Sequence, residues 1–263
     1  MNKFLLILLI VFSDLANAGL ITARSYLVTD DHGLVITSKN ADHVQPIASI
    51  TKLMTVMVVL DAEQPKDQLI KLDWSKATKY HTRLPRTIKK LTRDDLIGLA
   101  IVKSDNFAAY TLCANYPNGI DGCISAMNRK AQELNMKNTR FVDPTGLEEG
   151  NISNCYDLVS MVMQASTYLD ITDASNKPKV SIEVKKHWWE FKNTNPLVKA
   201  NGEIHVSKTG YIGGASGGCI VMYLETNQGP RIVVLLGSHN THTRIEEAEN
   251  IVLTVTSTDI RVN

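Results

Sequence analysis

The sequence has little of several features that would indicate particular protein classes. Aromatic residues make up only 6% of its 263 residues, and acidic and basic residues nearly cancel to a net charge of +1. Such a balance gives no overall field that would attract nucleic acid or an anionic membrane, so no nucleic-acid partner is predicted. No Cys-x-x-Cys pair is present, which excludes the usual sulfur-ligand metal sites. After the N-terminus, the apolar runs at 53–60 and 232–237 are too short to cross a bilayer.

The first eighteen residues have the features of a cleavable secretory signal. Lys3 precedes an apolar run at 4–12, and the small residues of Ala-Asn-Ala at 16–18 precede Gly19. The alternative is an uncleaved anchor, but the apolar run is too short to span a bilayer. We therefore predict that residues 1–18 are a signal peptide and that the mature protein is exported without a stable membrane anchor.

Export makes the four cysteines candidates for disulfide bonds, because disulfides persist in oxidising compartments. Cys113 and Cys123 bracket the turn-rich stretch "ANYPNGIDG", which a bridge would close. Cys155 and Cys219 are farther apart and can pair only if the fold brings them together. Buried free thiols are the alternative, particularly for Cys219 in an apolar run. The sequence leaves the disulfide state of all four open.

Hydrophobic periodicity predicts strands at both ends of the chain and helices between them. Residues 25–40 alternate around Asp-Asp-His-Gly and predict a hairpin, whereas the unbroken apolar run in 49–63 predicts a fully buried helix. Thr92 and Asp95 form an approximate capping box, and the basic segment 71–93 is predicted as loops and short turns. Further helices are predicted at 92–102, 106–116, 123–136, 155–169 and 244–259, and strands at 180–193, 203–213, 217–228 and 230–239. This pattern predicts a single α/β domain, residues 19–263, whose antiparallel sheet is built from N- and C-terminal segments and packed against a mostly helical middle region.

Three short motifs carry the chemistry. Ser49 and Lys52 form a Ser-x-x-Lys pair at the start of the buried helix, a pattern that alone is better explained by a helix cap. The chain also contains Ser-Asp-Asn at 104–106 and Lys-Thr-Gly at 208–210. Penicillin-binding proteins and class A β-lactamases carry these three elements together, and all three occur here in that order.

The resemblance extends from about Ser25 to Ile251. The segments "ASITKLMT", "SDNFAA", "FVDPTGL" and "SKTGYI" resemble the serine D,D-peptidases among the low-molecular-mass penicillin-binding proteins, of the peptidase S11 type. The stretch "NTNPLV" before "SKTG" is similar to the D-alanyl-D-alanine endopeptidases of the penicillin-binding protein 7 type. The sequence ends soon after its last predicted strand, whereas membrane-associated D,D-carboxypeptidases add a β-domain and an amphipathic anchor. The resemblance implies a β-lactamase/transpeptidase-like fold, with endopeptidase preferred over carboxypeptidase activity.

The nucleophile and its base follow from both the resemblance and the chemistry. Positions i and i+3 share a helix face, so the Ser49 hydroxyl and the Lys52 amine can meet. A serine hydroxyl needs a base beside it, and a lysine can act as that base when desolvation or a neighbouring positive charge lowers its pKa. The apolar helix would desolvate Lys52, and Lys208 would supply the second charge. The helix N-terminus also favours negative charge developing near Ser49.

The resemblance implies the other roles. Ser104 would relay protons with Lys52 and Lys208, Asn106 would hold a substrate peptide carbonyl, and Gly210 would let the substrate strand approach closely. Thr209 would bind the substrate carboxylate together with Lys208.

The reaction that the resemblance implies is acyl transfer through an ester on Ser49. The backbone N–H groups of Ser49 and Tyr211 would form the oxyanion hole. The expected partners are the D-Ala-containing stem peptides of peptidoglycan, with β-lactams as inhibitors, and neither a metal nor a cofactor is implied.

Four other functions remain as alternatives. A D,D-carboxypeptidase would remove terminal D-Ala, and a β-lactamase would need a glutamate to activate water. In the class A family this glutamate belongs to a Glu-x-Glu-Leu-Asn motif. The stretch "AQELN" (131–135) has Ala131 in place of the first glutamate of that motif and lies within a predicted helix. A non-catalytic penicillin-sensing or cell-wall-binding module is the third alternative. A metallopeptidase would rest on His239 and His242, which have no evident third ligand.

One segment departs from the family pattern. Where the family has Ser-Arg-Leu-x-x-Gly, this chain has "TRLPRTIKK" (82–90), which lacks the glycine and adds positive charge. These charges have two interpretations: a solvated loop, or a basic lip that suits an anionic cell-wall polymer.

Overall fold

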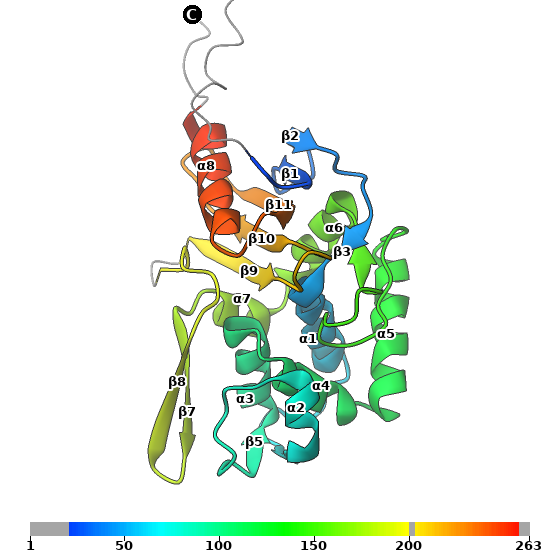
Figure 1. The fold of residues 1–263 in the computed structure, drawn as a ribbon, viewed down its shortest axis with the longest axis vertical. Coiled ribbons are helices and arrows are strands. Elements are labelled where there is room, and N and C mark those ends of the chain that lie inside the picture. Colours follow the sequence, from blue (N-terminus) through cyan, green and yellow to red (C-terminus); the bar gives the residue numbers. More distant parts are fainter. Residues whose placement is uncertain (1–20, 200–202, 258–263) are drawn as a thin grey trace, which may run out of the picture.

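The computed structural model describes residues 21–199 and 203–257, and a five-stranded antiparallel sheet forms one half of the molecule (Figure 1). The strand order is β2-β1-β11-β10-β9, so N-terminal strands pair with C-terminal ones and β9 is an edge strand of the described sheet. The strands are β1 (Ser25–Thr29), β2 (Val35–Lys39), β9 (Ile204–Gly210), β10 (Gly218–Leu224) and β11 (Arg231–Ser238). This confirms the predicted fold class.

The two faces of the sheet belong to two hydrophobic cores. In β11, Val233 and Leu235 pack with Ile251 of α8 (Thr243–Ser257), whereas Val234 belongs to the larger core with the other helices. Successive strand residues point to opposite faces, so this apolar run is buried on both sides. The predicted strand at 230–239 and the predicted helix at 244–259 therefore correspond to β11 and α8, which pack on each other.

The middle of the chain is helical, as predicted. Its helices are α1 (Thr51–Asp61), α2 (Ala77–Tyr80), α3 (Arg93–Gly98), α4 (Asn106–Ala114), α5 (Gly119–Glu133), α6 (Cys155–Ala165) and α7 (Leu169–Ser175). Shorter turns are η1 (Ala48–Ile50), η2 (Trp74–Lys76) and the π-helical η3 (Leu99–Lys103). Every residue of α1 from Thr51 to Val59 is buried, so this helix occupies the centre of the helical region.

Within the described ranges, three two-stranded sheets lie outside the main sheet. They are β3 (Gln45–Pro46) with β6 (Ile152–Ser153), β4 (Leu69–Lys71) with β5 (Lys90–Thr92), and β7 (Lys179–Val184) with β8 (His187–Lys192). The strands predicted at 180–193 thus form a separate hairpin, which Figure 1 shows beside α3. The hairpin packs Ile182 and Phe191 on the helical core. Its two strands pair with each other and not with a strand of the main sheet.

The capping box predicted from the sequence is confirmed by the structure. Thr92 and Asp95 form the complete capping box at the start of α3. Residues 131–133 are the last residues of α5, and Leu134 and Asn135 follow its end. The predicted signal peptide, 1–18, lies outside the described residues. None of the helices in the described ranges is both long and apolar enough to span a membrane.

One disulfide is present. Cys113 at the end of α4 is bonded to Cys123 in α5, with their Cα atoms 5.4 Å apart. Cys155 and Cys219 are buried free thiols. Burial raises the pKa of Cys155 to about 12 and that of Cys219 to about 11, so neither thiol ionises readily near neutral pH.

Candidate active site

The turn that carries Ser49 is held in an unusual conformation between two glycines. Ser49 lies in η1, and the preceding Ala48 has a φ of +48°, which costs energy for a residue with a Cβ. A Cβ at Gly146 would lie 1.9 Å from the Ala48 carbonyl oxygen, and one at Gly210 would lie 3.0 Å from the Ser49 nitrogen. The Ser49 N–H donates no hydrogen bond to any residue in the described ranges. Packing between distant segments therefore fixes the serine and leaves its N–H free.

Lys52 lies one helical turn further along, and its amine is the centre of the site. Its Nζ is 2.7 Å from Ser49 Oγ, 2.7 Å from Asn106 Oδ1 and 2.6 Å from the carbonyl oxygen of Thr145. The α1 helix has no side-chain cap, so Ser49 is not a helix cap in this structure. The predicted contact between hydroxyl and amine is formed.

The surroundings of Lys52 favour its unprotonated form. The side chain is fully buried, and this desolvation lowers its pKa from 10.5 to about 7. The carboxylates of Asp105 and Asp143 act in the opposite direction and raise the pKa. Near neutral pH, a substantial fraction of Lys52 is therefore a free amine beside the serine hydroxyl.

The loop that presents the Thr145 carbonyl is built around Asp143, which is not among the residues predicted from the sequence motifs. The buried Asp143 carboxylate accepts hydrogen bonds from the backbone N–H and hydroxyl of Thr145, the N–H groups of Gly146 and Glu148, and the Asn151 side chain. Asn151 in turn accepts from the N–H groups of residues 142 and 143. The stretch "DPTGL" with a following asparagine was the available signal, but its contact with Lys52 spans 93 residues of sequence.

The three side chains of the Ser-Asp-Asn segment differ in the hydrogen bonds that they make. Asn106 uses its carbonyl oxygen on Lys52, which leaves its amide N–H₂ for another acceptor. Asp105 caps α4 by accepting from the Ala108 N–H and also accepts from the Thr82 hydroxyl. Ser104 has a left-handed φ of 58°, and its hydroxyl makes no hydrogen bond with a described residue. The predicted relay through Ser104 is therefore not formed as a hydrogen-bonded chain here.

The Lys-Thr-Gly segment lies at the end of edge strand β9. Lys208 is buried, its Nζ donates to the Thr209 carbonyl at 3.0 Å, and the Thr209 hydroxyl donates to Thr194 at 2.6 Å. Burial lowers the pKa of Lys208 well below its usual value, and the positive charges of Lys52 and Arg244 lower it further. Lys208 is not among the charges that shift the pKa of Lys52, and burial favours its own neutral form, so the lowered pKa of Lys52 is due to its desolvation and not to the predicted second charge.

Gly210 lies against the turn that carries Ser49. Close approach of the substrate was the expected reason for a glycine here. In the structure, a Cβ added to Gly210 would lie 3.0 Å from Ser49 N, in the backbone of η1. The Gly210 carbonyl oxygen accepts from Arg244 at 2.9 Å. Tyr211 follows directly and is 47% exposed. A side chain at position 210 would push the nucleophile turn away from β9.

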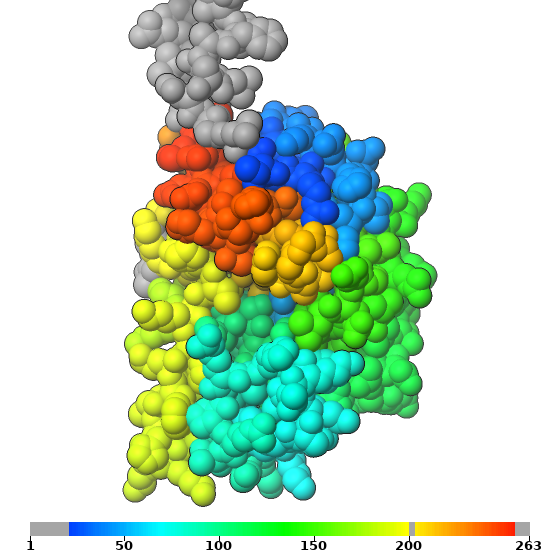
Figure 2. Space-filling model, viewed as in Figure 1, coloured from blue at the N-terminus to red at the C-terminus, as the bar shows by residue number. Residues whose placement is uncertain are grey.

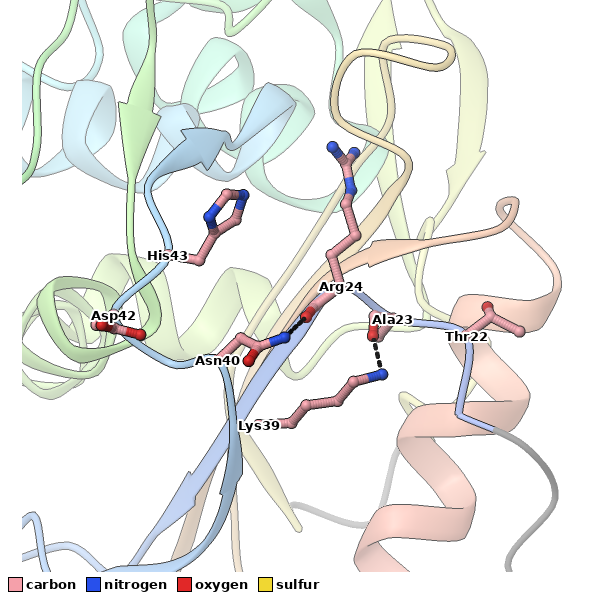
Figure 3. A pocket seen from close by; sticks show the side chains of 7 residues that line it. All are labelled: Thr22, Ala23, Arg24, Lys39, Asn40, Asp42 and His43. Carbon is pink, nitrogen blue, oxygen red and sulfur yellow. Dashed lines mark hydrogen bonds between the residues drawn. The ribbon is translucent and has the colours of Figure 1, made fainter.

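A shallow pocket lies where β1 begins, apart from the predicted site residues (Figure 3). In it, Lys39 donates to the Ala23 carbonyl and Asn40 to the Arg24 carbonyl. Arg24 reaches the Ala215 carbonyl at 2.9 Å, in the loop after β9. These hydrogen bonds fasten the chain that leads into β3 and the nucleophile turn.

No metal cluster is found in the described parts of the chain. No group of three or more histidine, cysteine, aspartate or glutamate side chains there is arranged to hold an ion. His239 and His242 are exposed, and His242 lies 3.3 Å from Glu246.

Comparisons with known proteins agree with this geometry. The family model described as "D-alanyl-D-alanine carboxypeptidase", peptidase S11, matches residues 13–240. The chain is 36% identical over 237 residues to the D-alanyl-D-alanine endopeptidase of Pseudomonas aeruginosa, covering 88% of this chain and 76% of the relative. It is 37% identical over 238 residues to the D-alanyl-D-alanine endopeptidase of Escherichia coli, with the same coverage.

Solved structures show the same fold. The Streptomyces DD-transpeptidase superposes with a TM-score of 0.81 at 23% identity, covering 89% of this chain and 97% of the other. Penicillin-binding protein D2 of Listeria monocytogenes, bound to cefotaxime, gives 0.76 at 25% identity, covering 89% and 97%. The fold, the site geometry and the family match lead to one conclusion: the chain belongs to the peptidase S11 family.

Proposed function

We propose that this protein is a serine-type D-alanyl-D-alanine endopeptidase that hydrolyses peptide cross-links in peptidoglycan. One observation carries the proposal: a fully buried amine with a pKa of about 7 lies 2.7 Å from a serine hydroxyl in the Ser-x-x-Lys motif. The family match supports a D,D-peptidase, and the names of the curated relatives favour endopeptidase over carboxypeptidase.

The proposed first step is attack by Ser49 on the D-Ala carbonyl. The neutral Lys52 amine takes the hydroxyl proton as the Ser49 Oγ–carbon bond forms. The free N–H of Ser49, together with that of Tyr211, stabilises the oxyanion. The C–N bond then breaks, and Lys52 returns the proton to the leaving amine. Water, activated by the same amine, hydrolyses the ester and restores the serine.

The remaining residues are proposed to orient the substrate. Asn106, whose carbonyl oxygen is occupied by Lys52, donates its amide N–H₂ to a substrate peptide carbonyl. Lys208 and Thr209 bind the carboxylate beside the scissile bond, which also returns Lys208 to its charged form. Gly210 acts through the turn it supports. Ser104 is proposed to relay protons with Lys52 and Lys208 once a substrate is bound.

β-Lactams are proposed to acylate the same serine. Structural relatives with cefotaxime and ampicillin bound support this, because β-lactams resemble the D-Ala-D-Ala unit. We also propose that residues 1–18 direct export to the periplasm and that 19–263 form one catalytic domain.

The decisive experiment combines two assays of purified protein. Fluorescent penicillin should label the wild type and leave Ser49→Ala unlabelled; equal labelling of both would refute the mechanism. Cross-linked and uncross-linked muropeptides are then digested in parallel. Cleavage of the cross-link supports the endopeptidase, release of free D-Ala alone identifies a carboxypeptidase, and rapid penicillin turnover identifies a β-lactamase.

A further inference from the structure

Positive charge is concentrated in one short segment of an otherwise acidic chain. Residues 71–93 hold eight of the 28 basic residues and one of the 27 acidic residues, so the rest of the chain has 20 basic and 26 acidic residues. Arg93 is buried and bonds to Gln68. The other seven cations are exposed, and we call them the basic face: Lys71, Lys76, Lys79, Arg83, Arg86, Lys89 and Lys90. The net charge of +1 conceals this separation.

The basic face is displayed on a packed scaffold. The Trp74 ring packs on Phe107 of α4, with centroids 5.2 Å apart, and its Nε1 donates to the Ile88 carbonyl at 2.8 Å. Tyr80 stacks on Tyr110, also in α4, with ring centroids 4.2 Å apart. The segment that carries the cations is therefore packed against α4, the helix that begins with Asn106.

The same segment contacts both loops of the active site. Thr82 donates to Asp105 at 2.7 Å, next to Asn106. Lys79 lies 3.7 Å from Glu148, in the loop that presents the Thr145 carbonyl to Lys52. Figure 2 shows the segment in cyan, below the recess that separates it from the gold loop after β9. The segment that carries the basic face therefore borders the active site on this side.

Ion pairs within the protein do not neutralise the basic face. Among the described residues, Lys79 is the one member of the basic face within 4.0 Å of a carboxylate. Asp73 is the segment's single acidic residue; hydrogen bonds from Ser75 hold its pKa below the usual range, and the charges of Lys76 and Lys71 add to this effect. Crowding like charges weakens a fold, so a binding role explains the basic face better than stability does.

We propose that the basic face binds free carboxylates of the peptidoglycan polymer, on stem peptides beyond the bond being cut. This inference rests on the proposed function, because the polymer is the substrate. Continuity with the active site favours it over a lipid surface or a nucleic acid, neither of which would enter the Ser49 site. Several exposed charges acting together give a useful affinity although each ion pair is weak and sensitive to salt.

The test compares two variants with the same change in charge. K76Q/R83Q/R86Q removes three cations from the basic face, and K185Q/K186Q/K192Q removes three exposed cations from the β7–β8 hairpin as a control. Binding to insoluble cross-linked peptidoglycan is measured by sedimentation at low salt. We expect about tenfold weaker binding for the first variant and little change for the control, the order expected from losing three exposed ion pairs. Penicillin labelling of each variant reports whether it is folded; if the triple variant fails it, Arg83→Gln and Arg86→Gln are measured singly.

Two further arms identify the ligand. Blocking the polymer's carboxylates as amides, or raising the salt to about 0.5 M, should reduce wild-type binding to the level of the first variant. Equal binding by both triple variants, or undiminished binding to the amidated polymer, overturns the proposal. Charge-dependent binding to phosphatidylglycerol vesicles with unchanged polymer binding would also overturn it. Failure of the proposed function would appear separately, as loss of the difference in penicillin labelling between wild type and Ser49→Ala.

Discussion

Gly210 of β9 lies directly against the backbone nitrogen of Ser49, with no room between them for a methyl group. A Cβ at position 210 would stand 3.0 Å from that nitrogen and 2.9 Å from the Ile47 carbonyl oxygen. The strand that carries the Lys-Thr-Gly motif thus supports the turn that carries the nucleophile.

Gly210→Ala should therefore slow acylation more than it weakens folding. Displacing the turn by a few tenths of an ångström moves both Ser49 Oγ and its N–H, and misplacement of this kind can cost about 10²-fold in rate. The measurement is the rate of penicillin acylation. Gly214→Ala, in the nearby loop where a Cβ would meet no atom within 4 Å, is the control. Equal rates for the two variants would contradict the proposed role of Gly210.

Acylation should rise with pH through about 7, because the neutral form of Lys52 is the base and its pKa is about 7. Below that pH the amine is protonated and cannot accept the serine proton. Lys52→Arg stays protonated at every accessible pH, so it should lose about 10²–10⁴-fold in acylation without recovering at high pH. A pH series of stopped-flow acylation rates tests this, and a flat profile for the wild type would count against Lys52 as the base.

Asp143→Asn should move the pH profile of acylation to lower pH. The Asp143 carboxylate raises the pKa of Lys52, so removing its charge lowers that pKa, while Asp105 and Lys208 still face the amine. The amide also turns a donor toward the Glu148 N–H or the Asn151 side chain, which should cost about 2–4 kcal/mol of unfolding free energy.

The matched control for that variant is Asp157→Asn. Asp157 is also buried and accepts hydrogen bonds from Asn138 and Thr139, but it is not among the charges that act on Lys52. It should lose stability in urea denaturation without a shift of the pH profile. A shift of equal size in both variants would indicate a general structural effect.

Thiol titration should count the cysteines in three steps. Native protein should react slowly with a disulfide reagent, because Cys155 and Cys219 are buried and their pKa values are raised. Unfolded, unreduced protein should show two thiols, and unfolded, reduced protein four, because Cys113 and Cys123 are bonded. Four thiols before reduction would contradict the disulfide.

The amino-acid sequence determined the features that depend on neighbours along the chain. Three such features could be recognised because each involves only a few residues that are close in sequence. They are the i, i+3 spacing of Ser49 and Lys52, the capping box of Thr92 and Asp95, and the alternation that marks β1 and β2. The family motifs extended that reach, since they identified three separated segments as parts of one site. The family and the fold class were therefore predicted correctly, whereas the short strands β3, β4, β5 and β6 and the helices α2 and α7 were not predicted.

Only the tertiary structure decided how those segments support one another. Asp143 organises the loop that reaches Lys52 across 93 residues, and Gly210 packs on the turn that carries Ser49. The pairing of Cys113 with Cys123, and the separation of the β7–β8 hairpin from the main sheet, were likewise settled by packing. Each of these contacts joins atoms that are near in space and remote in sequence, and burial of Lys52 by several segments at once is what lowers its pKa to about 7.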